Sequence, residues 1–321
     1  MPDGTTTAVS QDEPAVRTLE LTKHYGAAVA LSGLSMVVPR GEVFGFLGPN
    51  GSGKTTAVKL LLGLTHPTGG EAWVLGARAG NRQTRSRIGY LPELFRYQGW
   101  LSAREVLALH CRLAGIARAD WPGQISAALA TVGLTGHADA KVETFSKGMQ
   151  QRLGLGVALL GDPALGDPAL VVLDEPTSAL DPVGRADTRD IIRRLRDRGC
   201  AVFLNSHLLG EVEQICDRVA VVSNGRVLAT GSLDELLGTG GVRVRLTGVT
   251  DLARAALSRR GTVSEHDGWF IVTGVGVEAV PDLITDLVGT GARVYAVEPV
   301  RQTLEERFLS LLRDEEATWP S

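Results

Sequence analysis

One glycine-rich run of residues has the composition and spacing to bind a chain of phosphates. It consists of Gly48, Pro49, Asn50, Gly51, Ser52, Gly53, Lys54, Thr55 and Thr56, and it fits the pattern G-x-x-x-x-G-K-[ST]. The run lies between an apolar stretch at 42–47, predicted to be a buried strand, and one at 57–62, predicted to be a helix. In such a turn, backbone N–H groups and the positive helix end surround phosphate, Lys54 reaches the β and γ oxygens, and Thr55 can ligate Mg²⁺. We therefore predict an ATP site; the alternative is a glycine-rich turn that matches by accident.

Two adjacent acids follow a second apolar stretch, predicted to be a strand at 170–173. Carboxylates at such a point lie at the C-terminal edge of a parallel sheet, where ligands bind. Asp174 is predicted to hold Mg²⁺, directly or through water, and Glu175 to be the partner of the attacking water. The alternative is that both residues belong to a turn that only ends the strand. The phosphate loop upstream favours the site.

Two further segments make the prediction more specific. Ser146, Lys147 and Gly148 precede a helical run at 153–160, and His207 closes a predicted strand at 201–204. In this order, the phosphate loop, the Ser146 segment, the acidic strand and His207 together resemble the nucleotide-binding subunits of ABC transporters.

The resemblance implies roles for five residues. Ser146 and Gly148 would begin the signature helix, whose N-terminus caps the γ-phosphate held by the other subunit of a dimer. His207 would contact the γ-phosphate, Asp181 would belong to the loop between the two sites, and Tyr25 would stack on adenine. Taken singly, a histidine after a strand or a tyrosine within one is more often structural. The order of the elements is what supports these roles.

The resemblance extends over about residues 16–315 to the ABC-2 type export ATPases, the group that includes the daunorubicin resistance ATP-binding subunits. Two positions depart from the commonest ABC pattern. Lys147 replaces a glycine of the signature, and Glu93 stands where most members carry a glutamine that contacts Mg²⁺ and the attacking water. Both departures recur in the export group, so we expect an active enzyme with Glu93 on the metal side of the site. The alternative is that Glu93 lies in an exposed loop and binds nothing.

A perfect five-residue tandem repeat separates the signature helix from the acidic strand. Residues 161–165 and 166–170 both read Gly-Asp-Pro-Ala-Leu. Glycine and Asp-Pro mark each copy as turn material, so we interpret the repeat as a loop extension with little functional content. Loop-closure entropy rises by only about 0.6 kcal/mol per doubling of loop length, and we expect the fold to absorb it.

Composition indicates a compact protein of the cytoplasm. The chain has 321 residues, is 44% hydrophobic and carries a formal net charge of −3. Its apolar runs are far shorter than the roughly 18 residues of a membrane span, and its first residues lack the zones of a signal peptide. The three cysteines show no Cys-x-x-Cys spacing, which fits a reducing compartment and excludes a zinc ribbon. Because no basic face is evident, we predict no nucleic-acid partner.

The pattern of elements predicts two domains of different class. Residues 1–15 are predicted to be a flexible tail and 16–239 an α/β nucleotide-binding domain with a RecA-like P-loop sheet, interrupted by a helical subdomain at about 99–161. Ser102 with Glu105 forms a capping box that begins a helix in that subdomain. After a glycine-rich hinge at 238–241, residues 240–321 show the order β-α-β-β-α-β and a last helix, which predicts a small ferredoxin-like α+β domain.

The sequence therefore predicts an ATP-hydrolysing subunit that energises a separately encoded integral membrane permease. Export of a drug, an antibiotic or a lipid-like small molecule is the function that the resemblance implies. The resemblance also implies a homodimer of nucleotide-binding domains, bound peripherally to the inner face of the cell membrane through the permease. The alternatives are a soluble ABC ATPase that acts on nucleic acid or ribosomes, and a small-molecule kinase. The signature segment and Glu175 argue against the kinase.

Overall fold

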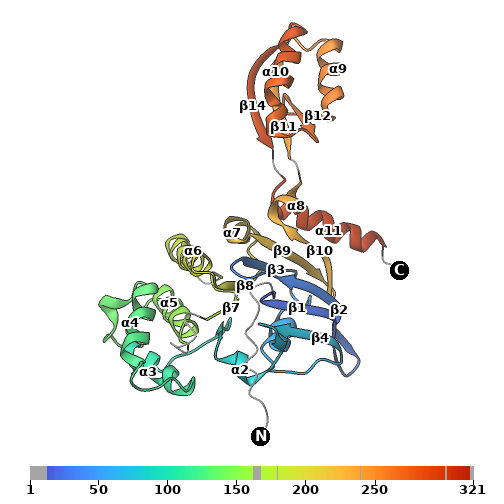
Figure 1. Cartoon of the computed structure of the whole chain (residues 1–321). Coiled ribbons are helices and arrows are strands. Elements are labelled where there is room, and N and C mark those ends of the chain that lie inside the picture. The colour runs from blue at the N-terminus through green and yellow to red at the C-terminus, as the bar shows by residue number, and fades with distance from the viewer. Residues whose placement is uncertain (1–12, 162–167, 179, 239, 301, 319–321) are drawn as a thin grey trace. The chain divides into compact units, whose positions relative to one another are not determined.

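The chain divides into two compact units between Thr230 and Gly231. A computed structural model describes residues 13–161, 168–178, 180–238, 240–300 and 302–318 (Figure 1). The division precedes the boundary predicted at 239/240, because a short helix, α8 (Leu233–Leu237), belongs to the second unit. The capping box of Ser232 and Glu235 begins that helix. Part of the predicted hinge, Thr239, lies outside the described residues.

A six-stranded sheet forms the centre of the first unit. Its strand order is β10 (Arg226–Ser232), β9 (Arg218–Ser223), β3 (Val43–Leu47), β8 (Ala201–Ser206), β7 (Leu170–Asp174) and β6 (Ile88–Leu91). The pairs β9/β3, β3/β8, β8/β7 and β7/β6 are parallel. Every residue of β3, β7 and β8 is buried, as expected for strands that are covered on both faces.

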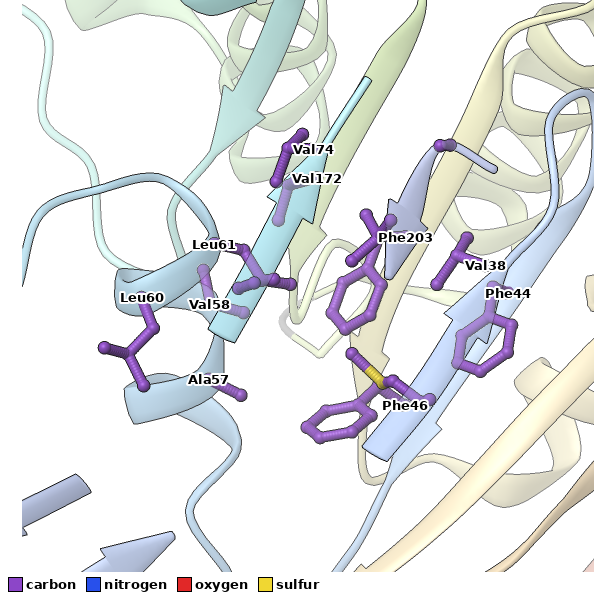
Figure 2. Packing of buried hydrophobic residues seen from close by; sticks show 14 of the residues in the cluster. Val38, Phe44, Phe46, Ala57, Val58, Leu60, Leu61, Val74, Val172 and Phe203 are labelled. Carbon is purple, nitrogen blue, oxygen red and sulfur yellow. The ribbon is translucent and has the colours of Figure 1, made fainter. Parts of the chain in front are cut away.

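Helices and a second sheet cover the two faces of this sheet. Helix α1 (Lys54–Leu61) and the antiparallel sheet share one hydrophobic cluster with the face that carries Phe44, Phe46 and Phe203. The antiparallel sheet has the order β2 (Ala28–Val38), β1 (Val16–Tyr25), β4 (Gly69–Val74) and β5 (Ala77–Arg78). Figure 2 shows the three phenylalanines packed together; the Phe203 ring lies 6.0 Å from that of Phe44 and 5.3 Å from that of Phe46. On the opposite face, α7 (Leu209–Ile215) packs against β3, and α6 (Pro182–Asp197) packs against β3 and β8.

Three helices form the subdomain that interrupts the parallel sheet. Helices α3 (Ala103–Leu113), α4 (Trp121–Thr131) and α5 (Lys147–Ala158) pack on one another beside the sheet (Figure 1). The capping box of Ser102 and Glu105 begins α3 as predicted. Short elements complete this region: α2 (Arg82–Arg85), η1 (Thr135–His137) and η2 (Val142–Thr144). Within the described residues, no helix is long and apolar enough to span a bilayer.

The second unit has the predicted β-α-β-β-α-β order. It comprises β11 (Gly241–Thr247), α9 (Asp251–Arg260), β12 (Thr262–His266), β13 (Trp269–Thr273), η3 (Val277–Ala279), α10 (Val280–Gly289), β14 (Arg293–Val300) and α11 (Leu304–Thr318). The antiparallel sheet order β12-β13-β11-β14 is that of a ferredoxin-like plait. Buried residues of β11 and β13 pack against α9 and α10. The predicted α+β class of this domain is therefore confirmed.

The tandem repeat is only partly described. Residues 162–167, which make up most of the predicted loop extension, lie outside the described residues. Its last residue, Leu170, is buried as the first residue of β7. Leu170 pairs with Ile88 on one side and Ala201 on the other. Any change in the repeat must therefore keep an apolar residue at this point of the sheet.

Candidate functional site

The phosphate loop connects β3 directly to α1, and its glycines stand where a larger residue would collide. A Cβ on Gly48 would lie 2.3 Å from the Val222 carbonyl oxygen and 2.4 Å from Ser52 Oγ. Gly53 has a φ of +99°, and a Cβ there would lie 2.3 Å from the Ala30 carbonyl oxygen. Both positions therefore require glycine on steric grounds, which explains the spacing seen in the sequence.

Lys54 is buried and curls back over the loop. Its Nζ donates to the carbonyl oxygens of Gly48 at 2.7 Å and Pro49 at 3.1 Å. Burial lowers the pKa of this ammonium group, and the negative charges of Glu175 and Asp174 act in the opposite direction. A cation held in this way, beside backbone N–H groups and a helix N-terminus, provides an anion site.

The other loop residues surround this cation. Pro49, Asn50, Gly51 and Thr55 are exposed, Thr56 is half-buried, and Ser52 is buried. The Ser52 backbone N–H donates to the Pro49 carbonyl at 3.2 Å, which closes the turn. The Ser52 hydroxyl oxygen is buried and has no hydrogen-bond partner among the described residues. It is thus a polar atom available to a ligand of the loop.

The two acids occupy the C-terminal end of β7, as predicted. Asp174 is the last residue of the strand and is buried; burial raises its pKa, and the hydrogen bond from Asn205 opposes the rise. Glu175 leaves the strand with a φ of +52°, a left-handed conformation that is uncommon outside glycine. Such backbone strain is frequent at functional sites, where the surrounding structure must hold it.

His207 lies directly against Glu175. Its Nδ1 is 2.7 Å from Glu175 Oε1, and its side chain is half exposed, whereas that of Glu175 is buried. The second carboxylate oxygen, Oε2, is buried without a partner among the described residues. The carboxylate is therefore held by one oxygen and has the other available to a ligand, such as a water molecule.

The donor set of the site fits Mg²⁺. This ion prefers oxygen ligands and is usually held by one or two carboxylates, waters and substrate phosphates. Asp174 supplies a buried carboxylate, and Thr55 supplies a hydroxyl on the first turn of α1. The described part of the chain has no cluster of three or more His, Cys, Asp or Glu that could hold a metal alone, so phosphate would complete the ligand set. Glu93 is exposed, yet its charge adds to the rise that burial causes in the pKa of Asp174 and opposes the fall that burial causes in the pKa of Lys54.

Tyr25 lies at the end of β1 with about half of its surface exposed. Its exposed fraction is 49%, and the Lys23 ammonium lies 4.9 Å from the ring centroid. Gly26, with a φ of +60°, turns the chain immediately after it toward β2. The ring is thus accessible and has the flat surface that stacking on a base requires.

Ser146 and Asp181 are both helix caps. Ser146 Oγ accepts from Met149 N at 3.2 Å at the start of α5, and Asp181 Oδ1 accepts from Gly184 N at 2.8 Å at the start of α6. The nearest atoms to a Cβ on Gly148 belong to Leu180 and Ser146, and none belongs to the phosphate loop. Within one copy of the chain, Ser146 and Asp181 therefore cap the N-termini of α5 and α6.

One residue of the site was missed by the sequence analysis. Asn205, near the end of β8, donates a hydrogen bond to the Asp174 carboxylate, 31 residues away along the chain. The sequence contained only a weak signal, a polar residue that ends an apolar strand. The structure brings together the phosphate loop, Asp174, Glu175 and His207.

Comparisons with known proteins agree with this geometry. Residues 31–178 match the family model described as ABC transporter. The chain is 39% identical over 313 residues to an uncharacterized ABC transporter ATP-binding protein of Synechocystis, covering 93% of this chain and 85% of that protein. It is 37% identical to the bacitracin transport ATP-binding protein of Bacillus licheniformis, covering 69% of this chain and 71% of the relative. It is also 37% identical to the Nod factor export ATP-binding protein I of Burkholderia lata, covering 67% and 70%.

A solved structure supports the same assignment. It is described as the ATP binding subunit of an ABC transporter, is 29% identical, and aligns with a TM-score of 0.61 over 69% of this chain and 91% of that chain. The predicted P-loop α/β fold is thereby confirmed. Proteins of this kind bind ATP, work with membrane components of a transporter and dimerise. By its sequence, its fold and the arrangement of its phosphate loop and acidic strand, this chain belongs to the ABC transporter family as an ATP-binding subunit, an ATPase.

Proposed function

We propose that this chain forms a homodimer that hydrolyses MgATP and drives a separately encoded membrane permease for export. The dimer would bind two nucleotides, each between the phosphate loop of one copy and the signature helix of the other. The subunit would lie at the inner face of the cell membrane, held there by the permease.

The position of the signature helix is the observation that most supports this proposal. The N-terminus of α5, at Ser146 and Lys147, is exposed to solvent. The atoms within 4 Å of a Cβ on Gly148 belong to Leu180 and Ser146, and none belongs to the phosphate loop of the same chain. An exposed helix N-terminus carries partial positive charge and free N–H groups. A second copy of the chain would bring these groups to a bound γ-phosphate.

Each residue of the site in one copy of the chain would have a separate role in ATP hydrolysis. Lys54 would bind the β and γ oxygens and balance the charge that develops on the transferred phosphoryl group. Glu175 would orient the attacking water and accept its proton through the carboxylate oxygen that has no partner among the described residues. His207, 2.7 Å from the other oxygen, would hold that carboxylate in place and contact the γ-phosphate. Bound Mg²⁺, held by Thr55 and Asp174, would supply electrostatic stabilisation of the phosphate oxygens.

Exposed apolar side chains near the helical subdomain support a protein partner. Leu94, Trp100 and Leu113 are exposed to 88%, 68% and 72%. Leu94 follows Glu93 directly in the chain, and the charge of Glu93 acts on Asp174. A partner that contacts Leu94 would therefore bind next to a residue that influences the site. Large apolar side chains that a monomer leaves exposed are often covered by a protein partner. We assign this surface to the permease.

The names of two relatives support export of a small molecule as the transport function. One relative is named for transport of bacitracin and another for export of Nod factor. We propose the same class for this chain, namely efflux of an antibiotic, another drug or a lipid-like small molecule. The permease would contact the cargo.

The test combines purified chain with membranes that contain the permease encoded beside it. ATP turnover should rise when the permease is present, and vesicles should export cargo only with both proteins. Replacing Trp100 and Leu113 by Ser should leave turnover of the isolated chain within twofold and remove the stimulation. Leu252→Ser, an equally exposed leucine on α9, is the matched control. Stimulation by ribosomes or RNA instead of permease would contradict the proposal.

A further inference from the structure

Asn205 stands between the two halves of the ATP site. It lies in β8, the strand between β3, which leads into the phosphate loop, and β7, which carries the acids. In the parallel register, Asn205 is level with Phe46 on one side and with Asp174 on the other. Because side chains alternate along a strand, Asn205 shares a face with Phe203, and Asp174 shares one with Val172. Phe203 and Val172 belong to the cluster that contains α1, so both polar side chains lie on the α1 side of the sheet.

The side chain and the backbone of Asn205 each hold one acid. Its side-chain Nδ2 donates to Asp174 Oδ1, and its carbonyl oxygen accepts from the Glu175 backbone N–H at 2.9 Å. A carboxylate only accepts hydrogen bonds, so the amide nitrogen must be the atom that faces Asp174. The backbone bond holds Glu175 at the point where its φ of +52° turns the chain out of the strand.

The remaining polar atom of Asn205 has no partner among the described residues. Asn205 is 2% exposed, and its Oδ1 is buried and has no hydrogen-bond partner among the described residues. The same holds for Oε2 of Glu175, the residue after Asp174. Leaving a buried amide oxygen unpaired costs about 1–3 kcal/mol, so such an atom in a native site indicates a ligand that donates a hydrogen bond to it in the working state. Water bound to a metal ion is a strong donor and fits this acceptor.

We propose that Asn205 is a positioning residue for the metal side of the site. Its amide fixes the rotamer of Asp174 so that the carboxylate faces the metal, and its free oxygen accepts a hydrogen bond from a water on that metal. This role rests on the proposed ATPase function and assigns a task to a residue outside the phosphate loop, the acidic pair and the histidine. Partners that orient metal ligands in this way typically change metal affinity or activity about 10- to 100-fold when they are removed.

The experiment measures how strongly Mg²⁺ tightens nucleotide binding. Nucleotide affinity is measured by calorimetry with ATP, in EDTA and in excess Mg²⁺, on hydrolysis-deficient Glu175→Gln protein so that ATP persists. Asn205→Leu keeps the branched shape of the side chain and its number of heavy atoms and removes both side-chain bonds, while the backbone bond to Glu175 stays. Asn205→Ser, which is smaller and polar, is the second variant in case the leucine form folds poorly.

The proposal expects a selective loss. In both variants, ATP affinity in EDTA should remain within twofold of the parent. The Mg²⁺ factor, which is the ratio of ATP affinity in excess Mg²⁺ to that in EDTA, should fall at least about tenfold. If the parent's Mg²⁺ factor is itself below about ten, it should fall to one. With an intact Glu175, the Mg²⁺ concentration for half-maximal hydrolysis should rise by a similar factor, and turnover at saturating Mg²⁺ should change less. Thr188→Val, which removes the side-chain hydrogen bond of another fully buried residue in the same unit, should leave the Mg²⁺ factor unchanged.

Two results would overturn the proposal. An unchanged Mg²⁺ factor in both Asn205 variants would reduce Asn205 to a structural residue, as would equal losses with and without Mg²⁺. These outcomes leave the ATPase function intact. Failure of the ATPase function itself appears differently, because the parent protein would then bind no ATP.

Discussion

Replacing Glu175 by Gln separates its chemical role from its structural one. The substitution keeps the side-chain shape, the backbone bond from Glu175 N to the Asn205 carbonyl at 2.9 Å, and an oxygen that can accept from His207. The substitution replaces the charged oxygen that contacts His207 Nδ1 at 2.7 Å by a neutral one. A hydrogen bond to a charged group stabilises a protein by about 1 kcal/mol more than a hydrogen bond between neutral groups. We therefore expect the free energy of unfolding to change by about 1 kcal/mol or less.

The expected effect on catalysis is larger. Removal of a general base typically lowers turnover about 10²- to 10⁴-fold, which is about 3–5 kcal/mol of barrier. The expected change in the activation free energy of hydrolysis exceeds the expected change in the free energy of unfolding. The Glu175→Gln protein should therefore fold and bind ATP but scarcely hydrolyse it, and its ATP-bound dimer should persist.

The assay is steady-state phosphate release at saturating MgATP, together with thermal unfolding and size-exclusion chromatography in ATP. Glu71→Gln, at a partly exposed glutamate paired with Arg78, is the matched control and should match the wild type in all three measurements. Turnover of the Glu175→Gln protein within tenfold of the wild type would refute the assignment. Loss of ATP binding would also refute it, since the phosphate loop is untouched.

Three further outcomes are expected. Glu93→Ala should raise the Mg²⁺ needed for half-maximal hydrolysis and should reduce transport more than turnover, whereas Glu93→Gln should stay active; wild-type behaviour of the alanine form on both measures would leave only the exposed-loop interpretation. Deletion of residues 166–170 restores a leucine before Val171, so hydrolysis should stay within tenfold, about 1.4 kcal/mol of barrier; a greater loss would show that the added turn supports β7. Phe203→Ala removes a fully buried ring that packs on two others and should lower the free energy of unfolding by about 3–5 kcal/mol in urea; a change below about 1 kcal/mol would mean that the shared cluster is not the core of the first unit.

Features that depend on neighbouring residues could be predicted from the sequence. The phosphate loop is contiguous, and its glycines 48 and 53 are required by contacts within a few residues or with nearby strands, so the pattern itself carries the chemistry. The capping box that begins α3 is likewise local. The order of elements in the second unit followed from alternation and turn residues, and the sheet order β12-β13-β11-β14 is the usual one for that succession.

Other features depend on which strands become neighbours. Nothing near Asn205 in the sequence indicates that its side chain binds Asp174, because that contact arises only when β8 pairs in parallel with β7. The same pairing brings His207 to Glu175 and gives Glu175 a backbone partner for its left-handed turn. The phosphate loop and the role of Asp174 and Glu175 at the end of a strand could thus be predicted from the residues next to them in the chain. The tertiary structure decided how the acids are held, since the parallel register joins residues that are about 30 positions apart.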